Sequence, residues 1–248
     1  MIFNYESPEL ITINILELVK RQKIINDKFP NPNRKSKYIN VYDNMVGQIS
    51  EEVFETKESI TKNKEMALPV KVQTNDSLEE FIDVLMFTGS LLVETATYFE
   101  IDIIDFLKHN DDYAYILIYD TYKDNDFKEE NRNIPTCENL VYTRRQIIDR
   151  KYHKPAKERP ENYEINLIKS IIVGTFLPRK NDKDNNEDIY EEFKIPEFIT
   201  NMNPYIQDVL FCYDDELNFS LARKYLIEDR INLLNELFEN KNKKIANL

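Results

Sequence analysis

The sequence predicts an all-α protein, and three observations lead to that class. Apolar residues recur at helical intervals along several segments, prolines interrupt these segments, and only three glycines occur in 248 residues. So few glycines argue against turn-rich β-sandwiches and against glycine-rich loops that bind phosphates or dinucleotides. We therefore expect one α-helical domain over residues 1–248, with a less regular insertion at about residues 123–194.

Two helices are predicted in the first part of the chain. Apolar residues recur at helical intervals from about Pro8 to Phe29, where two prolines follow. A second helix is predicted from near Tyr42 to about Lys62, and Glu52 and Glu55 lie beside its apolar stripe. Pro69 then separates this helix from the next one.

A third predicted helix begins at Asp76 or at Ser77, carries Glu80 and Asp83, and is apolar on nearly all sides. That pattern is typical of a helix in the protein interior. Ser77 followed three residues later by Glu80 also matches a capping box. In that alternative, Glu80 would accept a hydrogen bond from the backbone at the helix start instead of binding a ligand.

The rest of the chain yields shorter predictions. We expect helices around Ile101–Lys108, over Glu164–Leu177 and along the segment after Pro204, an apolar and tyrosine-rich run at Tyr113–Tyr122, and a frayed tail at Lys241–Leu248. Charged and asparagine-rich stretches within the insertion are typical of loops.

The composition narrows the range of partners. A formal net charge of −12 opposes non-specific binding to nucleic acid and to anionic membranes. No stretch approaches the roughly 18 uncharged apolar residues of a membrane span, and the first residues lack the pattern of a signal peptide. We therefore expect a cytoplasmic protein. Cys137 and Cys212 are too few and too isolated for a disulfide framework or a zinc site.

Two acidic pairs carry most of the functional information. Glu52 and Glu55 are three residues apart, as are Glu80 and Asp83, so each pair places both carboxylates on one face of its helix. If the two helices pack together, the four carboxylates form one cluster. Hard divalent cations such as Mg²⁺ prefer oxygen ligands, and the phosphates of a nucleotide can complete their shell. The pairs therefore favour metal-dependent phosphate chemistry.

A structural explanation competes with this one. The chain has 45 acidic residues, so acidic pairs also arise on solvated helix faces, and this explanation is sufficient for Glu52 and Glu55 taken alone. Asp83 differs because its neighbours on both sides are apolar. An ionised carboxylate in such surroundings needs a metal, a Lys or Arg partner, or a proton.

In the order of these motifs, the chain resembles the all-α nucleoside triphosphate pyrophosphatases, and among them the dimeric, MazG-related dUTPase branch found in phages, some bacteria and trypanosomatids. The family pattern Q-x-x-x-N corresponds to Gln22 and Asn26, its E-x-x-E to Glu52 and Glu55, and its E-x-x-D to Glu80 and Asp83. A C-terminal family motif aligns in part with residues 214–225, where Asn218 fits, Arg223 lies two positions later than the family arginine, and acidic residues replace the expected lysine and first asparagine.

The resemblance implies a helical bundle of the pyrophosphatase type, a homodimer and a Mg²⁺-dependent hydrolase, with Mn²⁺ as a possible substitute. It implies conversion of dUTP, or of dUDP or dCTP, to the monophosphate in the cytoplasm, which is the host cytoplasm if a phage encodes the protein. The implied metal ligands are the four carboxylates, with Glu55 also a candidate to activate water, and the implied substrate contacts are Gln22, Asn26, Asn218 and Arg223.

Several alternatives stay open. The basic residues of Thr143–Gln146 could hold the phosphates instead of Arg223, although such a run is also typical of a solvated helix face. The related enzymes commonly place a tryptophan near the nucleotide, whereas this chain has none and would use tyrosine or phenylalanine. Two other interpretations compete with a dUTPase. The protein could be a MazG-type housecleaning pyrophosphatase for other nucleotides, or a non-catalytic helical protein with a nucleotide-binding or regulatory role.

Overall fold

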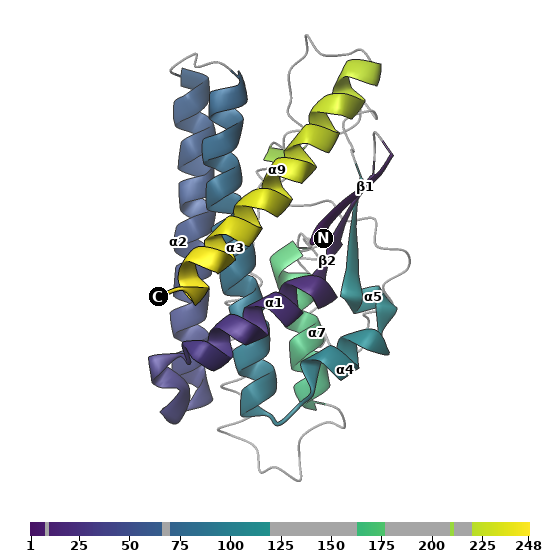
Figure 1. Cartoon of the computed structure of the whole chain (residues 1–248). Coiled ribbons are helices and arrows are strands. Elements are labelled where there is room, and N and C mark those ends of the chain that lie inside the picture. The colour runs from purple at the N-terminus through teal and green to yellow at the C-terminus, as the bar shows by residue number, and fades with distance from the viewer. Residues whose placement is uncertain (8–9, 66–69, 120–162, 177–208, 211–219) are drawn as a thin grey trace, which may run out of the picture.

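The long helices of the protein form its largest layer. The computed structural model describes residues 1–7, 10–65, 70–119, 163–176, 209–210 and 220–248 (Figure 1). α2 (Tyr38–Glu65) and α3 (Val70–Tyr98) run antiparallel over nearly their whole length. α1 (Ile15–Lys28) and α9 (Ser220–Ala246) both pack against α3. The described residues are mostly helical, as the sequence predicts, and the core lies around α3.

A small antiparallel sheet accompanies the helices. β1 (Phe3–Ser7), β2 (Leu10–Asn14) and β3 (Tyr115–Tyr119) pair in the order β1-β2-β3. β3 belongs to the tyrosine-rich run and pairs with β2 so that Leu10 faces Tyr119 and Asn14 faces Tyr115. The sheet lies beside the helical layer, on the side opposite to α2 (Figure 1).

The predicted start of the first helix near Pro8 is wrong, because Leu10–Asn14 forms β2. Ile11 and Ile13 are β-branched and alternate with polar residues, which suits a paired strand better than a helix. The helix begins directly afterwards at Ile15. The side chain of Asn14 accepts a hydrogen bond of 2.9 Å from the backbone N–H of Glu17, so Asn14 is the N-cap that separates the two structures.

Helix α3 begins at Val70, seven residues before Ser77. Ser77 is buried, and its hydroxyl lies 3.2 Å from that of Ser59 on α2. The capping-box alternative is therefore wrong, because Glu80 lies inside the helix, where no free backbone N–H needs a cap. Helix α2 also starts earlier than predicted, at Tyr38.

The C-terminal segment is the third difference from the sequence predictions. α9 continues to Ala246, through the segment that was predicted to fray. Ile245 packs against the core, and Lys243 and Lys244 lie in the last turn, where positive charge interacts favourably with the helix dipole. The predicted helices near residue 101 and over 164–177 are confirmed as α4 (Ile103–Lys108) and α7 (Tyr163–Phe176). A further short helix, α5 (Asp111–Ala114), precedes β3.

Helix α3 is unusually apolar, and most of it is covered. Among the described residues, the stretch Asp76–Tyr98 is the one long and apolar enough to cross a membrane, and 72% of its window is buried inside the protein. A buried core helix meets the same criterion, so this is weak evidence for a membrane span. Apart from α7, the predicted insertion at about 123–194 lies outside the described residues.

Candidate functional site

The four predicted carboxylates converge because α2 and α3 form an antiparallel pair. Glu52 and Asp83 are equally far from the centre of the connection at residues 66–69, and so are Glu55 and Glu80. In an antiparallel pair of helices, residues at equal distances from the connection lie opposite each other. Both acidic pairs therefore reach the same level of the helix pair, and each carboxylate of α2 meets one of α3.

The geometry of the cluster is close to that of a cation site. Glu52, Glu80 and Asp83 each offer a carboxylate oxygen, and these three atoms lie within 4.8 Å of one another. Glu55 lies beside Glu80, so that Glu80 can donate a hydrogen bond to it when Glu80 is protonated. The ligands of an octahedral Mg²⁺ ion lie about 3 to 4 Å apart. The three oxygens lie within a distance little larger than that spacing, and oxygen is the ligand that Mg²⁺ prefers, so the donor set fits a hard divalent cation.

Burial and mutual repulsion raise the pKa values of two carboxyl groups in the cluster. The pKa of Glu52 is raised to about 7, first by burial and then by the neighbouring charges of Asp83, Glu55 and Glu80. The pKa of Glu80 is also raised, first by burial and then by the neighbouring charges of Glu55 and Asp83. Glu52 and Glu80 therefore hold protons more strongly than isolated glutamates do.

One cation of the protein reaches this cluster from α9. The Lys241 ammonium forms an ion pair with Asp83, whose side chain is 20% exposed, and its charge also lowers the pKa values of Glu52 and Glu80. Of the partners left open for Asp83, the structure contains the basic residue. Sequence reasoning missed Lys241 because it lies 158 residues from Asp83, within the segment predicted to fray.

Gln22 and Asn26 lie on α1, where it packs against α3 at a second place away from the carboxylate cluster. The Nε2 group of Gln22 donates to Oδ1 of Asn26 at 3.1 Å, and Nδ2 of Asn26 donates to Ser90 and to Glu94, both at 2.9 Å. Both amides are buried. The Oε1 atom of Gln22 is buried and has no hydrogen-bond partner among the described residues. The two predicted base-reading residues are thus together, with one acceptor left over.

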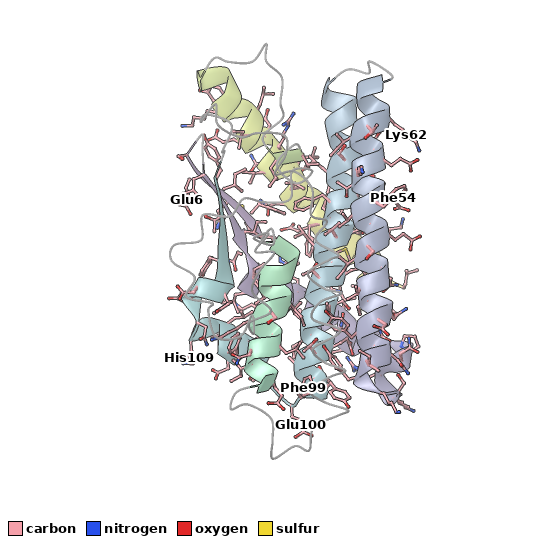
Figure 2. All side chains as sticks on the ribbon, turned by 180° about the vertical axis from the view of Figure 1, so that it is seen from behind. Glu6, Phe54, Lys62, Phe99, Glu100 and His109 are labelled. Atoms are coloured by element: carbon pink, nitrogen blue, oxygen red, sulfur yellow. The ribbon has the colours of Figure 1, made fainter. Side chains whose placement is uncertain are left out.

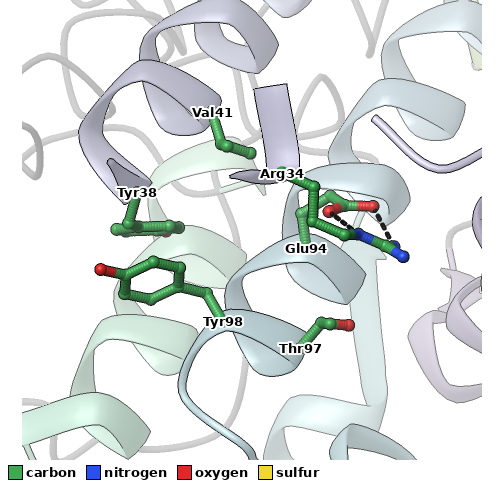
Figure 3. A pocket seen from close by; sticks show the side chains of 6 residues that line it. All are labelled: Arg34, Tyr38, Val41, Glu94, Thr97 and Tyr98. Atoms are coloured by element: carbon green, nitrogen blue, oxygen red, sulfur yellow. Dashed lines mark hydrogen bonds and ion pairs between the residues drawn. The ribbon is translucent and has the colours of Figure 1, made fainter. Parts of the chain in front are cut away.

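Arg34 joins this hydrogen-bond network through Glu94, the residue that also accepts from Asn26. Its guanidinium binds both carboxylate oxygens of Glu94, at 2.9 and 2.7 Å, and the Glu94 side chain is only 1% exposed (Figure 3). Beside the pair, a pocket of about 140 Å³ is lined by Arg34, Tyr38, Val41, Glu94, Thr97 and Tyr98. It is smaller than the roughly 300 Å³ at which ligand pockets begin. We therefore interpret it as a packing gap beside a structural ion pair.

A polar stripe on α3 connects the two places. Asp83, Ser90 and Glu94 are spaced by 7 and 4 residues, which keeps them on one face of the helix. The spacing of 11 residues puts Glu94 about 16 Å along the axis from Asp83. This stripe on an otherwise apolar helix is a sequence signal that would have found Ser90 and Glu94. Arg34 has no comparable signal.

The remaining predicted contacts are not tested by the geometry. Asn218 lies outside the described residues, as do Thr143–Gln146. Arg223 lies in α9, and its side chain is not among those described. Comparisons with protein-family models, curated proteins and solved structures give no significant match to this chain. The family resemblance therefore rests on the motifs themselves.

Proposed function

We propose that this protein is a Mg²⁺-dependent nucleotide pyrophosphohydrolase, with dUTP as the first candidate substrate and dUDP and dCTP as the next. The observation that supports this proposal is the convergence of Glu52, Glu55, Glu80 and Asp83 from two packed helices. Acidic clusters on solvated surfaces spread apart because like charges repel. Here three oxygens stay within 4.8 Å, and burial together with the neighbouring carboxylates raises the pKa of Glu52 to about 7.

The residues of the cluster divide into two roles in this proposal. Glu52, Glu80 and Asp83 hold the cation, because their oxygens are the three that approach one another. Bound Mg²⁺ supplies charge neutralisation of the phosphates and a lower pKa for a coordinated water. Glu55 orients that water or accepts its proton, because it is a carboxylate at the edge of the set and lies beside Glu80.

The hydrogen bonds of Gln22 and Asn26 favour a second candidate, a MazG-type pyrophosphatase with broader substrates. A residue that reads a base needs free donors and acceptors, whereas Asn26 uses its amide on Ser90 and Glu94. Of the polar atoms of these two side chains, Oε1 of Gln22 is the one that is buried without a hydrogen-bond partner among the described residues. A dedicated dUTPase therefore requires that these amides exchange partners when substrate binds.

The test is a screen of the common dNTPs, with dUDP, for pyrophosphate or phosphate release in the presence of Mg²⁺. We expect the unaltered protein to hydrolyse at least one nucleotide, and Asp83→Asn and Glu52→Gln to abolish turnover while circular dichroism shows an intact helical fold. Glu51→Gln is the matched control, because Glu51 neighbours Glu52 but is exposed. No hydrolysis of any nucleotide, or unchanged hydrolysis by Asp83→Asn, would contradict the proposal. Comparable rates on all substrates would favour the MazG-type alternative.

A further inference from the structure

The only described cation that acts on the carboxylate cluster is on a flexible side chain. Lys241 pairs with Asp83, and it is the only described basic residue whose charge affects Glu52 and Glu80. One ammonium against four carboxylates leaves the cluster negative. A divalent cation that binds Asp83 competes with the ammonium for this carboxylate, because two cations in contact with one carboxylate repel each other.

Lys241 is free to leave without undocking α9. The helix is held earlier along its length by Asn235, whose side chain bonds the backbones of Ile2 and Phe3, and by Phe238, which is fully buried. The Lys241 side chain is 36% exposed. Its four-carbon stem can therefore swing the ammonium several ångströms while the helix stays in place.

We propose that Lys241 exchanges partners during ligand binding: it neutralises Asp83 in the metal-free protein, and after a divalent cation displaces it, its ammonium binds the phosphate group held by that cation. This inference rests on the metal-binding part of the proposed function and adds a phosphate ligand to it. The exchange keeps opposite charges adjacent in both states. In the metal-free state the anion is a carboxylate, and in the bound state it is the phosphate that approaches the same cluster.

The exchange has two measurable consequences of opposite sign, because Lys241 competes with the metal and assists the phosphate. In Lys241→Met, which keeps most of the stem, we expect Mg²⁺ or Mn²⁺ alone to bind about 5-fold to 150-fold more tightly, the usual range for coupled sites. Inorganic pyrophosphate, titrated at saturating Mg²⁺, should bind at least about 5-fold more weakly. Lys243→Met is the matched control, because it removes the same charge from an exposed position on the same helix turn.

Isothermal titration calorimetry of the full-length protein measures both affinities without any need for turnover. Tighter metal binding together with weaker pyrophosphate binding, and no such changes in Lys243→Met, would support the exchange. Unchanged or weaker metal binding in Lys241→Met would overturn it, and so would unchanged pyrophosphate binding. Lys241→Arg keeps the charge and should restore most of the pyrophosphate affinity. A protein that shows both effects but hydrolyses no nucleotide would refute the proposed function and leave this inference standing.

Discussion

Glu52 should make the stability of the metal-free protein depend on pH. Its pKa is about 7 in the folded protein and 4.5 at its ordinary value, so between these two pH values the folded state binds more protons than the unfolded state. Stability therefore falls as pH rises from about 4.5 to about 7. Glu52→Gln removes the contribution of Glu52 to this dependence, and the raised pKa of Glu80 leaves a further contribution of the same sign. In thermal unfolding with EDTA, we expect the variant to melt above the unaltered protein at pH 8 and to lose that advantage at pH 4.

The protonation of Glu52 should also make the affinity for Mg²⁺ depend on pH. Because a carboxylate must lose its proton before it binds a cation, Mg²⁺ affinity should increase as pH rises towards 7 and above. The exposed neighbour Glu51 offers the control, since Glu51→Gln removes an equal charge outside the cluster. If Glu52→Gln and Glu51→Gln gave the same pH profile of melting temperature, the raised pKa of Glu52 would be refuted.

Gln22 should affect the choice of nucleotide more than the binding of metal. Its unpaired buried Oε1 atom is available to a donor group of a base. Gln22→Ala should lower kcat/KM for the preferred nucleotide by an amount equivalent to about 1–3 kcal/mol and leave Mg²⁺ affinity unchanged. Other nucleotides should lose less. Lys23→Ala, at the next and more exposed position, controls for helix effects, and an equal loss on every nucleotide would assign Gln22 to the scaffold.

The contact between α1 and α3 is tight at Gly89. A Cβ atom there would lie 3.3 Å from Cβ of Gln22 and from Cγ of Leu18. α1 therefore approaches α3 so closely that a side chain at this position would push its neighbours by a few tenths of an ångström. That close approach brings Gln22 and Asn26 against the polar stripe of α3.

Gly47 on α2 and Gly89 on α3 should respond oppositely to alanine. Gly47 on α2 is exposed and has nothing within 4 Å of an added Cβ, so Gly47→Ala should stabilise the protein by about 0.5–1 kcal/mol through helix propensity alone. At Gly89 the crowding should outweigh that gain and give a net loss of about 1 kcal/mol. Urea unfolding measures both, and a Gly89→Ala protein as stable as Gly47→Ala would show that α1 can withdraw without cost.

Helix α2 carries solvent-exposed residues on its outer face as well as the two carboxylates that face α3. Phe54 and Lys62 project away from the rest of the molecule (Figure 2), and Phe54 is 63% exposed. Glu52 and Glu55 flank Phe54 in sequence but turn towards α3. Position on the helix, rather than acidity, separates the cluster from the solvated residues of the same segment.

At the scale of the whole molecule, the two ends of the chain are joined. Asn235 on α9 accepts hydrogen bonds from the backbone N–H groups of Ile2 and Phe3, both at 3.1 Å, and donates one of 3.0 Å to the carbonyl of Phe3. Asn235 is 8% exposed. These bonds fix α9 against β1, and that docking carries Lys241 to the carboxylate cluster.

Removing this side chain should therefore weaken the whole fold. Asn235→Ala leaves three backbone groups without their buried partner, and we expect a loss of about 3 kcal/mol in the free energy of unfolding. Hydrogen exchange should rise in β1 and in the second half of α9 together. Asn232→Ala, at an exposed position one turn earlier, should change stability by less than about 0.5 kcal/mol. Equal effects of the two substitutions would mean that α9 docks without Asn235.

The helical class and the two acidic pairs can be predicted from the sequence, because helical period and three-residue spacing are local properties of the chain. The sequence also left a basic partner open for Asp83. It did not determine strand β2, where pairing with β1 and β3 outweighs a short apolar run that suits either structure. Tertiary structure alone decided that Lys241 reaches Asp83 and that Arg34 pairs with Glu94. Those contacts depend on how distant segments of the chain dock, and this cannot be predicted from the spacing of residues within one segment.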